Sequence, residues 1–312
     1  MPELPEVETV RAGLAPVLTG ARVDSVEVLD ARSLKRHPAG VADFKEQLVG
    51  RRILGVVRRG KFLWMPLSID SDDRAIALVG HLGMSGQMLL RTPGFEADKL
   101  TRVVIGVTAA TGEQFEFRFI DQRIFGSLAI DLLEPTDDGF VGGFCPEAAG
   151  AESWRGLIPS TAAHIRRDPL DESFDGGAVT SKLRAKNTGI KRALLDQGLL
   201  SGIGNIYADE ALWRARLHYD QPCSSLSKTK LAELLEHVTE ILRDAVAEGG
   251  TSFDEQYKNV NGESGYFAVS LNAYGQTGLP CKRCGKPIRR DSWANRGSHF
   301  CPNCQRLKTP SK

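Results

Sequence analysis

Four cysteines near the C-terminus constrain the fold of this chain more than any other feature. Their order is Cys281-x2-Cys284-x16-Cys301-x2-Cys304, which is the spacing of a zinc site with four thiolate ligands. Two disulfides are the alternative, but the N-terminus carries no apolar signal segment, and a cytosolic compartment keeps thiols reduced. We therefore expect one structural Zn²⁺ per chain, because four thiolates leave no open position for catalysis.

The segment that holds these cysteines is strongly basic. Residues 272–312 contain nine Lys or Arg against one acid, Asp291, which gives a formal charge of +8, whereas the whole chain carries only +1. A basic zinc module on a mildly acidic body is typical of a protein that binds a polyanion at one end. Nucleic acid is the default partner, and a solvated basic tail is the simpler alternative.

Composition indicates a soluble enzyme of two or three units. The 312 residues are 41% apolar and 25% charged, and no run of 18 apolar residues predicts a membrane span. We expect a cytoplasmic, nucleoid-associated monomer. Changes of pattern divide the chain into an N-terminal domain over 1–133, a linker over 134–150, a helical domain over 151–271 and a zinc finger over 272–312.

The N-terminal domain has the pattern of short strands. Apolar residues alternate over 103–107 and again over 115–119, with a turn at Thr111-Gly112 between them, which predicts a hairpin with one buried face. We expect further strands over 22–29, 52–58, 62–67 and 75–81, and a helix over 5–18. Such a series of short strands predicts a sandwich or a barrel.

Beyond the linker the apolar period becomes helical. An apolar stripe over 231–245 follows Ser227, which can cap a helix, and precedes Gly249, which can end it. Gly202 and Gly204 stand just before Asn205, where a new helix can start. Free amides at that start favour a phosphate, although close helix packing also requires glycine.

The first residues suggest a reaction. Removal of Met1 makes Pro2 a secondary amine next to Glu3, and an α-amino group with a pKa of about 7.7 to 8.0 is roughly a tenth unprotonated near pH 7. Its attack on a sugar or carbonyl carbon gives a cationic iminium, an electron sink for elimination. Glu3 can supply the proton for such a step. Taken alone, the two prolines, Pro2 and Pro5, are more simply explained as stiffening of an exposed terminus.

Six motifs, in order over residues 1 to about 307, resemble the formamidopyrimidine-DNA glycosylase family. They are MPELPEVETV at 1–10, RGKF at 59–62, HLGMSG at 81–86, DQRIFG at 121–126, SGIGNIY at 201–207 and the four-cysteine finger. The resemblance implies a multidomain α+β fold: an N-terminal β-sandwich, a helix-two-turn-helix domain and a zinc finger, with damaged double-stranded DNA in the cleft between the halves. It also implies a base excision repair enzyme that removes oxidised purines (8-oxoguanine, formamidopyrimidines) and cleaves the abasic site by β,δ-elimination.

The same resemblance assigns roles to individual residues. Pro2 is the implied nucleophile on C1′, Glu3 the acid for the sugar ring oxygen, and Lys61 a phosphate-binding lysine that can also donate a proton. The implied DNA-binding residues are the gap-filling Met84, Arg123 and Phe125 and the phosphate contacts His81, Asn205 and Arg296. Arg123 would pair with the orphaned cytosine, which implies a purine lesion. Glu6 is a further site residue without an assigned role.

Two other functions stay open at this stage. One is an endonuclease VIII-like glycosylase for oxidised pyrimidines. The other is a non-catalytic zinc protein that binds DNA damage, against which Pro2, Glu3 and Lys61 argue. Residues 251–270 would form the lesion-recognition loop, but 253–257 differ from the sequence expected there, so lesion preference is less determined than catalysis.

Overall fold

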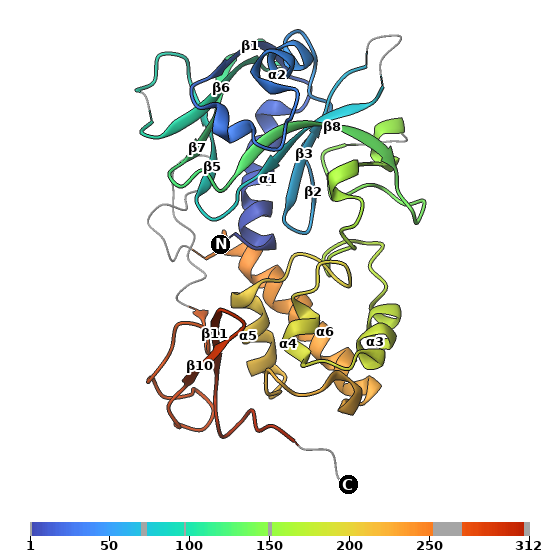
Figure 1. The fold of residues 1–312 in the computed structure, drawn as a ribbon, viewed down its shortest axis with the longest axis vertical. Coiled ribbons are helices and arrows are strands. Elements are labelled where there is room, and N and C mark those ends of the chain that lie inside the picture. Colours follow the sequence, from blue (N-terminus) through green and yellow to red (C-terminus); the bar gives the residue numbers. More distant parts are fainter. Residues whose placement is uncertain (1, 70–73, 97, 149–151, 252–269, 309–312) are drawn as a thin grey trace. The chain divides into compact units, whose positions relative to one another are not determined.

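The computed structural model describes residues 2–69, 74–96, 98–148, 152–251 and 270–308 (Figure 1). They fall into two compact units. Unit 1 lies within Met1–His164 and Gly249–Gly265, and unit 2 within Ile165–Glu248 and Tyr266–Lys312. Within the described part of the chain, no helix is both long and apolar enough to span a membrane.

Unit 1 is built on two antiparallel sheets, with strand orders β1-β6-β7-β5 and β2-β3-β4-β8-β9. The strands are β1 (Arg22–Val28), β2 (Val57–Arg59), β3 (Phe62–Pro66), β4 (Ile76–His81), β5 (Gly86–Arg91), β6 (Thr101–Thr108), β7 (Gln114–Asp121), β8 (Ser127–Pro135) and β9 (Leu157–Pro159). The helical elements are α1 (Leu4–Leu18), η1 (Ala31–Leu34), α2 (Gly40–Leu48), η2 (Ser153–Gly156) and η3 (Ser160–Ala162). Apolar residues of α1 and of both sheets share one buried core, and Figure 1 shows α1, in dark blue, against the strands. The predicted sandwich is confirmed.

The predicted β6–β7 hairpin is also confirmed. Its register pairs Val103 with Phe119 and Ile105 with Phe117, and all four side chains are buried. The expected strand over 52–58 was wrong except at its end, because only Val57–Arg59 forms a ladder. Ahead of β2, Arg52 makes an isolated bridge to Arg22, so the segment changes partner instead of continuing one strand.

Unit 2 combines several helices with a β-hairpin. Its elements are α3 (Gly176–Ala185), α4 (Ile190–Leu194), α5 (Asn205–Arg214), η4 (Cys223–Ser225), α6 (Lys228–Ala247), β10 (Arg289–Trp293) and β11 (Arg296–Phe300). Ser227 caps α6, because its hydroxyl oxygen accepts the Lys230 N–H at 3.1 Å. The apolar stripe of α6 is buried, and α3 and α5 pack against this helix.

The Pro- and Gly-rich stretch after β8 packs within unit 1. The backbone of Phe144 exchanges hydrogen bonds with that of Arg58, and Cys145 is buried. The domain boundaries given above, including a linker over 134–150, stay a prediction.

Candidate active site and nucleic-acid interface

The N-terminus of α1 is held by two glutamates. Pro2 is buried, and Glu3 occupies the N-cap position, with 2% of its surface exposed. Glu6 Oε2 accepts the Glu3 N–H at 2.8 Å, which forms one half of a capping box. Glu6 Oε1 accepts both the N–H and the hydroxyl of Thr251, at 2.8 and 2.9 Å. Glu6, which had no assigned role, thus fixes the backbone next to Pro2.

A buried ion-pair network joins α1 to β2. Glu8 Oε2 accepts Arg58 Nε at 2.8 Å, and Glu8 Oε1 accepts Arg11 Nε at 2.9 Å. Both guanidinium groups lie over the Phe144 ring, with distances of 5.3 and 5.7 Å to its centroid. Removal of one member would leave a buried charge without its partner. Because Arg58 stands three residues before Lys61, the network places the Lys61 turn relative to α1.

Lys61 and His81 belong to the same part of unit 1. The His81 ring packs edge-on against Phe62 at 5.8 Å, and burial, followed by the charges of Arg36, Lys35 and Lys61, lowers the pKa of His81 to about 4. His81 is therefore neutral at pH 7. Its Nδ1 accepts the Gly83 N–H at 3.1 Å, which leaves the ring proton on Nε2.

The three residues predicted to fill the DNA gap come from two loops in backbone contact. Gly83 has a φ of +61°, and a Cβ at this position would lie 2.5 Å from the Phe125 carbonyl carbon. Only glycine allows this approach. Met84 and Phe125 are 45% and 48% exposed, and Arg123 is exposed as well. The structure thus brings Met84, Arg123 and Phe125 together on neighbouring loops, ready to meet a ligand from solvent.

A single buried carboxylate, Asp121, orders both loops. Asp121 Oδ1 accepts the Ser85 hydroxyl at 2.6 Å and the Arg123 N–H at 3.1 Å, and Oδ2 accepts the Gly126 N–H at 2.7 Å. Sequence reasoning missed this role. The signal was an Asp two residues before Arg123, since Asp side chains commonly accept the backbone N–H two positions later.

In unit 2, the structure brings together the two predicted phosphate contacts, Asn205 and Arg296. Asn205 is the first residue of α5, and its Nδ2 donates to the Gly297 carbonyl at 3.0 Å. Arg296, next to Gly297 in the chain, is exposed at the start of β11. One amide N–H of Asn205 therefore anchors the strand that presents Arg296.

A buried lysine, missed by sequence reasoning, holds the same hairpin. Lys191 Nζ lies 2.6 Å from Asp209 Oδ1 and also donates to the Gly297 carbonyl and the Ser298 hydroxyl, at 3.2 and 2.8 Å. Asp209 Oδ2 accepts the His299 N–H at 2.8 Å. The Lys191 and Asp209 side chains are almost completely buried. Loss of either charge would leave the other buried without a partner and would destabilise the fold.

The four cysteines of the finger converge. Their Sγ atoms all lie within 4.8 Å of one another, and those of Cys284 and Cys301 are 3.5 Å apart. Tetrahedral zinc with Zn–S bonds of about 2.3 Å places its sulfurs about 3.8 Å apart, so these residues fit one structural zinc ion. Gln305 supports the site, because its side-chain oxygen accepts the Cys301 N–H at 2.8 Å.

The predicted residues divide between the units. Unit 1 holds Pro2, Glu3, Glu6, Lys61, His81, Met84, Arg123 and Phe125, and unit 2 holds Asn205, Arg296 and the cysteines. Most of the expected lesion-recognition loop, residues 252–269, lies outside the described residues.

A two-sheet unit that starts at Pro2, together with a helical unit ending in a four-cysteine finger, defines the class of helix-two-turn-helix DNA glycosylases. Residues 1–128 match the formamidopyrimidine-DNA glycosylase N-terminal domain, 165–256 its H2TH domain, and 278–307 the zinc finger found in FPG and IleRS. The chain belongs to the formamidopyrimidine-DNA glycosylase family.

Known proteins of this family match nearly the full length of the chain in sequence and in structure. Formamidopyrimidine-DNA glycosylases of Leifsonia xyli and Streptomyces avermitilis are 53% and 50% identical to this chain. Each alignment covers 98% of this chain, and the alignments cover 100% and 98% of the two relatives. The Lactococcus lactis Fpg bound to DNA with an abasic site aligns with a TM-score of 0.77 and 30% identity, over 97% of this chain and 99% of that one. MutM in complex with carbocyclic 8-oxo-G DNA aligns with a TM-score of 0.77 and 31% identity, over 98% and 100%. This chain is a base excision repair enzyme, a DNA glycosylase with AP-lyase activity, and the two alternative functions are not favoured.

Proposed function

We propose that this enzyme excises oxidised purines, 8-oxoguanine and formamidopyrimidines, from duplex DNA through a Schiff base on Pro2. The observation that carries the proposal is the N-terminus of α1, where Pro2 is buried and the neighbouring Glu3 N–H is bound by Glu6 at 2.8 Å. A catalytic group held in this way reaches its target with little loss of freedom. MutM, which aligns over 98% of this chain, has been solved in complex with DNA that contains carbocyclic 8-oxo-G.

The reaction begins once Met1 is removed, because a retained Met1 would turn the Pro2 nitrogen into an amide without a nucleophilic lone pair. The nitrogen attacks C1′ of the damaged nucleotide, the glycosidic bond breaks, and the base leaves with the bonding electrons and takes up the proton that the Pro2 nitrogen loses. Glu3 protonates the ring oxygen, the sugar ring opens, and the nitrogen–C1′ bond becomes an iminium. Loss of a C2′ proton then expels the 3′ phosphate, and a second elimination expels the 5′ phosphate.

Unit 1 supplies the residues around the reacting nucleotide. Lys61 binds the phosphate beside it, and His81, neutral at pH 7, contributes an Nε2–H donor to a phosphate. Eversion of the lesion costs a few kcal/mol of stacking, so the gap must be filled. Met84 fills it, Phe125 separates the base pairs, and Arg123 donates to the orphaned cytosine. The shared exposure of these three side chains supports these roles.

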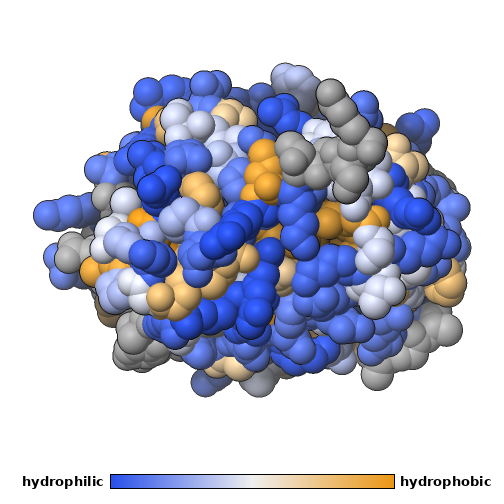
Figure 2. Space-filling model, turned by 90° about the horizontal axis from the view of Figure 1, so that it is seen from below, coloured by the Kyte–Doolittle hydropathy of each residue, from blue (hydrophilic) through white to orange (hydrophobic). Residues whose placement is uncertain are grey.

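Unit 2 binds the DNA backbone. Asn205 and Arg296, joined through Gly297, contact phosphates from α5 and from the zinc-stabilised hairpin. Hydrophilic side chains predominate on the face seen in Figure 2, and its apolar side chains form separate small groups. Large exposed apolar patches mark interaction sites, so the hydrophilic character of this face supports the monomer that we propose. The proposed DNA contacts support its action on DNA in the nucleoid.

Borohydride trapping tests the proposal. The substrates are one duplex with 8-oxoguanine opposite cytosine and one with an oxidised pyrimidine, and intact mass confirms the loss of Met1. We expect an adduct mainly on the 8-oxoguanine duplex. Pro2→Gly should strongly reduce it, because the imine of a primary amine must first gain a proton to become cationic. Pro5→Ala is the matched control and should trap normally, since Pro5 lies inside the first turn of α1.

Each other outcome has a distinct meaning. Adducts on the pyrimidine duplex alone would assign the enzyme to the endonuclease VIII-like class. An absence of adducts on both duplexes, with Met1 removed, would favour a protein that binds damage without cleaving it.

A further inference from the structure

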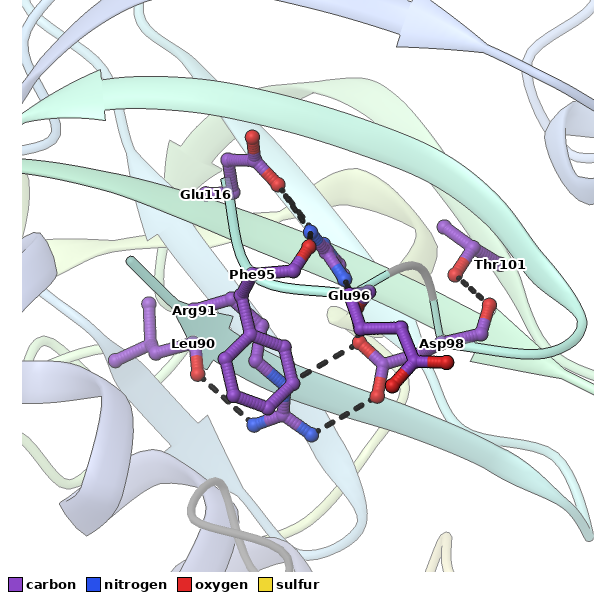
Figure 3. A network of polar contacts seen from close by, with 8 residues as sticks. Leu90, Arg91, Phe95, Glu96, Asp98, Thr101 and Glu116 are labelled. Carbon is purple, nitrogen blue, oxygen red and sulfur yellow. Dashed lines mark hydrogen bonds and ion pairs between the residues drawn. The ribbon is translucent and has the colours of Figure 1, made fainter. Parts of the chain in front are cut away.

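Four charged side chains form a network between β5, β7 and the turn that leads into β6 (Figure 3). Asp98 Oδ1 accepts Arg91 Nη2 at 3.0 Å, Asp98 Oδ2 accepts Arg118 Nη1 at 2.8 Å, and Glu116 Oε2 accepts Arg118 Nη2 at 2.6 Å. We call Arg91, Asp98, Glu116 and Arg118 the brace. The Arg118 and Asp98 side chains are only 7% and 18% exposed, so these charges are poorly solvated and depend on each other.

The brace holds a turn in an unusual conformation. The Asp98 carbonyl accepts the Thr101 hydroxyl at 2.7 Å and the Thr101 N–H at 3.3 Å, and Leu100 between them has a φ of +65°. A leucine rarely adopts this left-handed conformation, which persists only where the surroundings impose it. Burial of the leucine does not impose it, because Leu100 is 45% exposed. Hydrogen bonds hold the turn instead, those from Thr101 to the Asp98 carbonyl and one from the Asp121 N–H to the Leu100 carbonyl.

The turn in its observed conformation binds the backbone of Asp121. The Leu100 carbonyl accepts the Asp121 N–H at 3.2 Å, and Arg102 Nε donates to the Asp121 carbonyl at 2.8 Å. Both backbone polar groups of Asp121 are therefore held from the segment that starts at Asp98. The side chain of Asp121 in turn orders the Arg123 loop through the Arg123 and Gly126 N–H groups.

We propose that Asp98 is a positioning residue for recognition of the base opposite the lesion: it fixes Arg123 through Leu100 and Asp121. The proposal rests on the proposed function of Arg123. Without the Asp98 carboxylate, Leu100 relaxes toward a negative φ and its carbonyl turns away from the Asp121 N–H. Asp121, where the Arg123 loop begins, is then no longer held in place. Recognition of one opposite base over another requires accurate placement of the Arg123 guanidinium donors. Loss of the Asp98 carboxylate therefore reduces the discrimination between bases opposite the lesion.

The test compares Asp98→Asn with Asp24→Asn. Asp24 is a matched control on β1 of the same sheet, where its carboxylate accepts Arg22 Nε at 2.8 Å and the Thr108 hydroxyl at 2.5 Å. Among the described residues, neither contact of Asp24 involves Asp121. Single-turnover excision of 8-oxoguanine opposite cytosine and opposite adenine is measured for each variant, together with its Tm. We expect Asp98→Asn to lower the cytosine-to-adenine rate ratio about tenfold, the effect of a small misplacement of a binding group. Asp24→Asn should keep the ratio, even if its Tm falls equally.

A double mutant separates this proposal from the proposed function. Arg123→Ala should lose the preference, and Asp98→Asn combined with Arg123→Ala should lose no more, because both changes act on one group. If Arg123→Ala keeps the preference, the function proposed for Arg123 fails. If Arg123→Ala loses it while Asp98→Asn keeps it, or slows both substrates equally, the positioning role is overturned. Glu116→Gln, a milder change in the brace, replaces Asp98→Asn if that variant does not fold.

Discussion

The Ser85 hydroxyl donates to Asp121 Oδ1 at 2.6 Å, and this bond joins the loop that carries Met84 to the loop that carries Arg123. The carboxylate is fully buried and accepts three hydrogen bonds from the two loops. The residues that we propose to fill the DNA gap thus depend on one group that does not itself reach the surface. Their geometry is set before DNA binds, which lowers the cost of ordering them on binding.

Asp121→Asn should disrupt both loops, because an amide nitrogen cannot accept a hydrogen bond. At least one N–H or hydroxyl loses its acceptor, at a cost of about 1–3 kcal/mol in the free energy of unfolding. We expect 8-oxoguanine excision to fall at least about tenfold in single-turnover assays. Asp131→Asn is the control, since Asp131 lies on β8 of the other sheet and binds Ser160 and Thr161 of η3. Equal excision by both variants would contradict the role of Asp121.

Arg296→Ala should weaken binding to damaged and undamaged duplexes alike. Loss of one phosphate contact reduces the slope of log K against log salt by about 0.9. Arg289→Ala is the matched control, because Arg289 is also exposed on the hairpin but pairs with Phe300 at its opposite end. Fluorescence anisotropy over a salt series measures both slopes. A slope unchanged in Arg296→Ala would remove this residue from the DNA contacts.

The low pKa of His81 predicts a loss of stability in acid. The pKa is about 4 in the folded protein and about 6.5 in an unfolded chain. The folded state therefore favours neutral His81, and this contribution is complete above pH 6.5 and is lost as the pH falls toward 4. His81→Asn keeps a side-chain acceptor but cannot titrate. Urea denaturation measures the free energy of unfolding of His81→Asn and of wild type. The variant should gain stability relative to wild type as the pH falls from 7 to 4.5, and a difference that stays constant would contradict the assigned pKa.

Removal of zinc should abolish tight DNA binding. Four thiolates without a metal cannot hold a segment too small for its own core, so the hairpin that presents Arg296 loses its support. We expect a chelator to reduce DNA affinity at least about tenfold, and one equivalent of Zn²⁺ to restore it. Metal analysis and anisotropy on the same samples check the stoichiometry. Full affinity in a zinc-free sample would show that the finger does not support the interface.

Local patterns predicted the fold well where a period or a cap exists. The alternation over 103–107 and 115–119 predicted β6 and β7, and Ser227 with the stripe after it predicted α6. The polar support of the site has no such period. Glu8 and Arg58 are 50 residues apart, and Ser85 and Asp121 are 36 apart, so only the folded chain pairs them. The family resemblance named residues expected to meet DNA, but the residues that hold them came from the structure.

The buried pair of Lys191 and Asp209 makes the zinc finger an inseparable part of unit 2. Lys191 donates to the finger backbone at Gly297, and Asp209 accepts from His299, so helix and finger complete each other's polar contacts. Deletion of the finger would expose Lys191 and Asp209, which are buried in the intact protein. A finger grafted from another protein would meet the same two charges. An exchanged finger should therefore be accepted only when its hairpin presents a backbone carbonyl to Lys191 and a backbone N–H to Asp209.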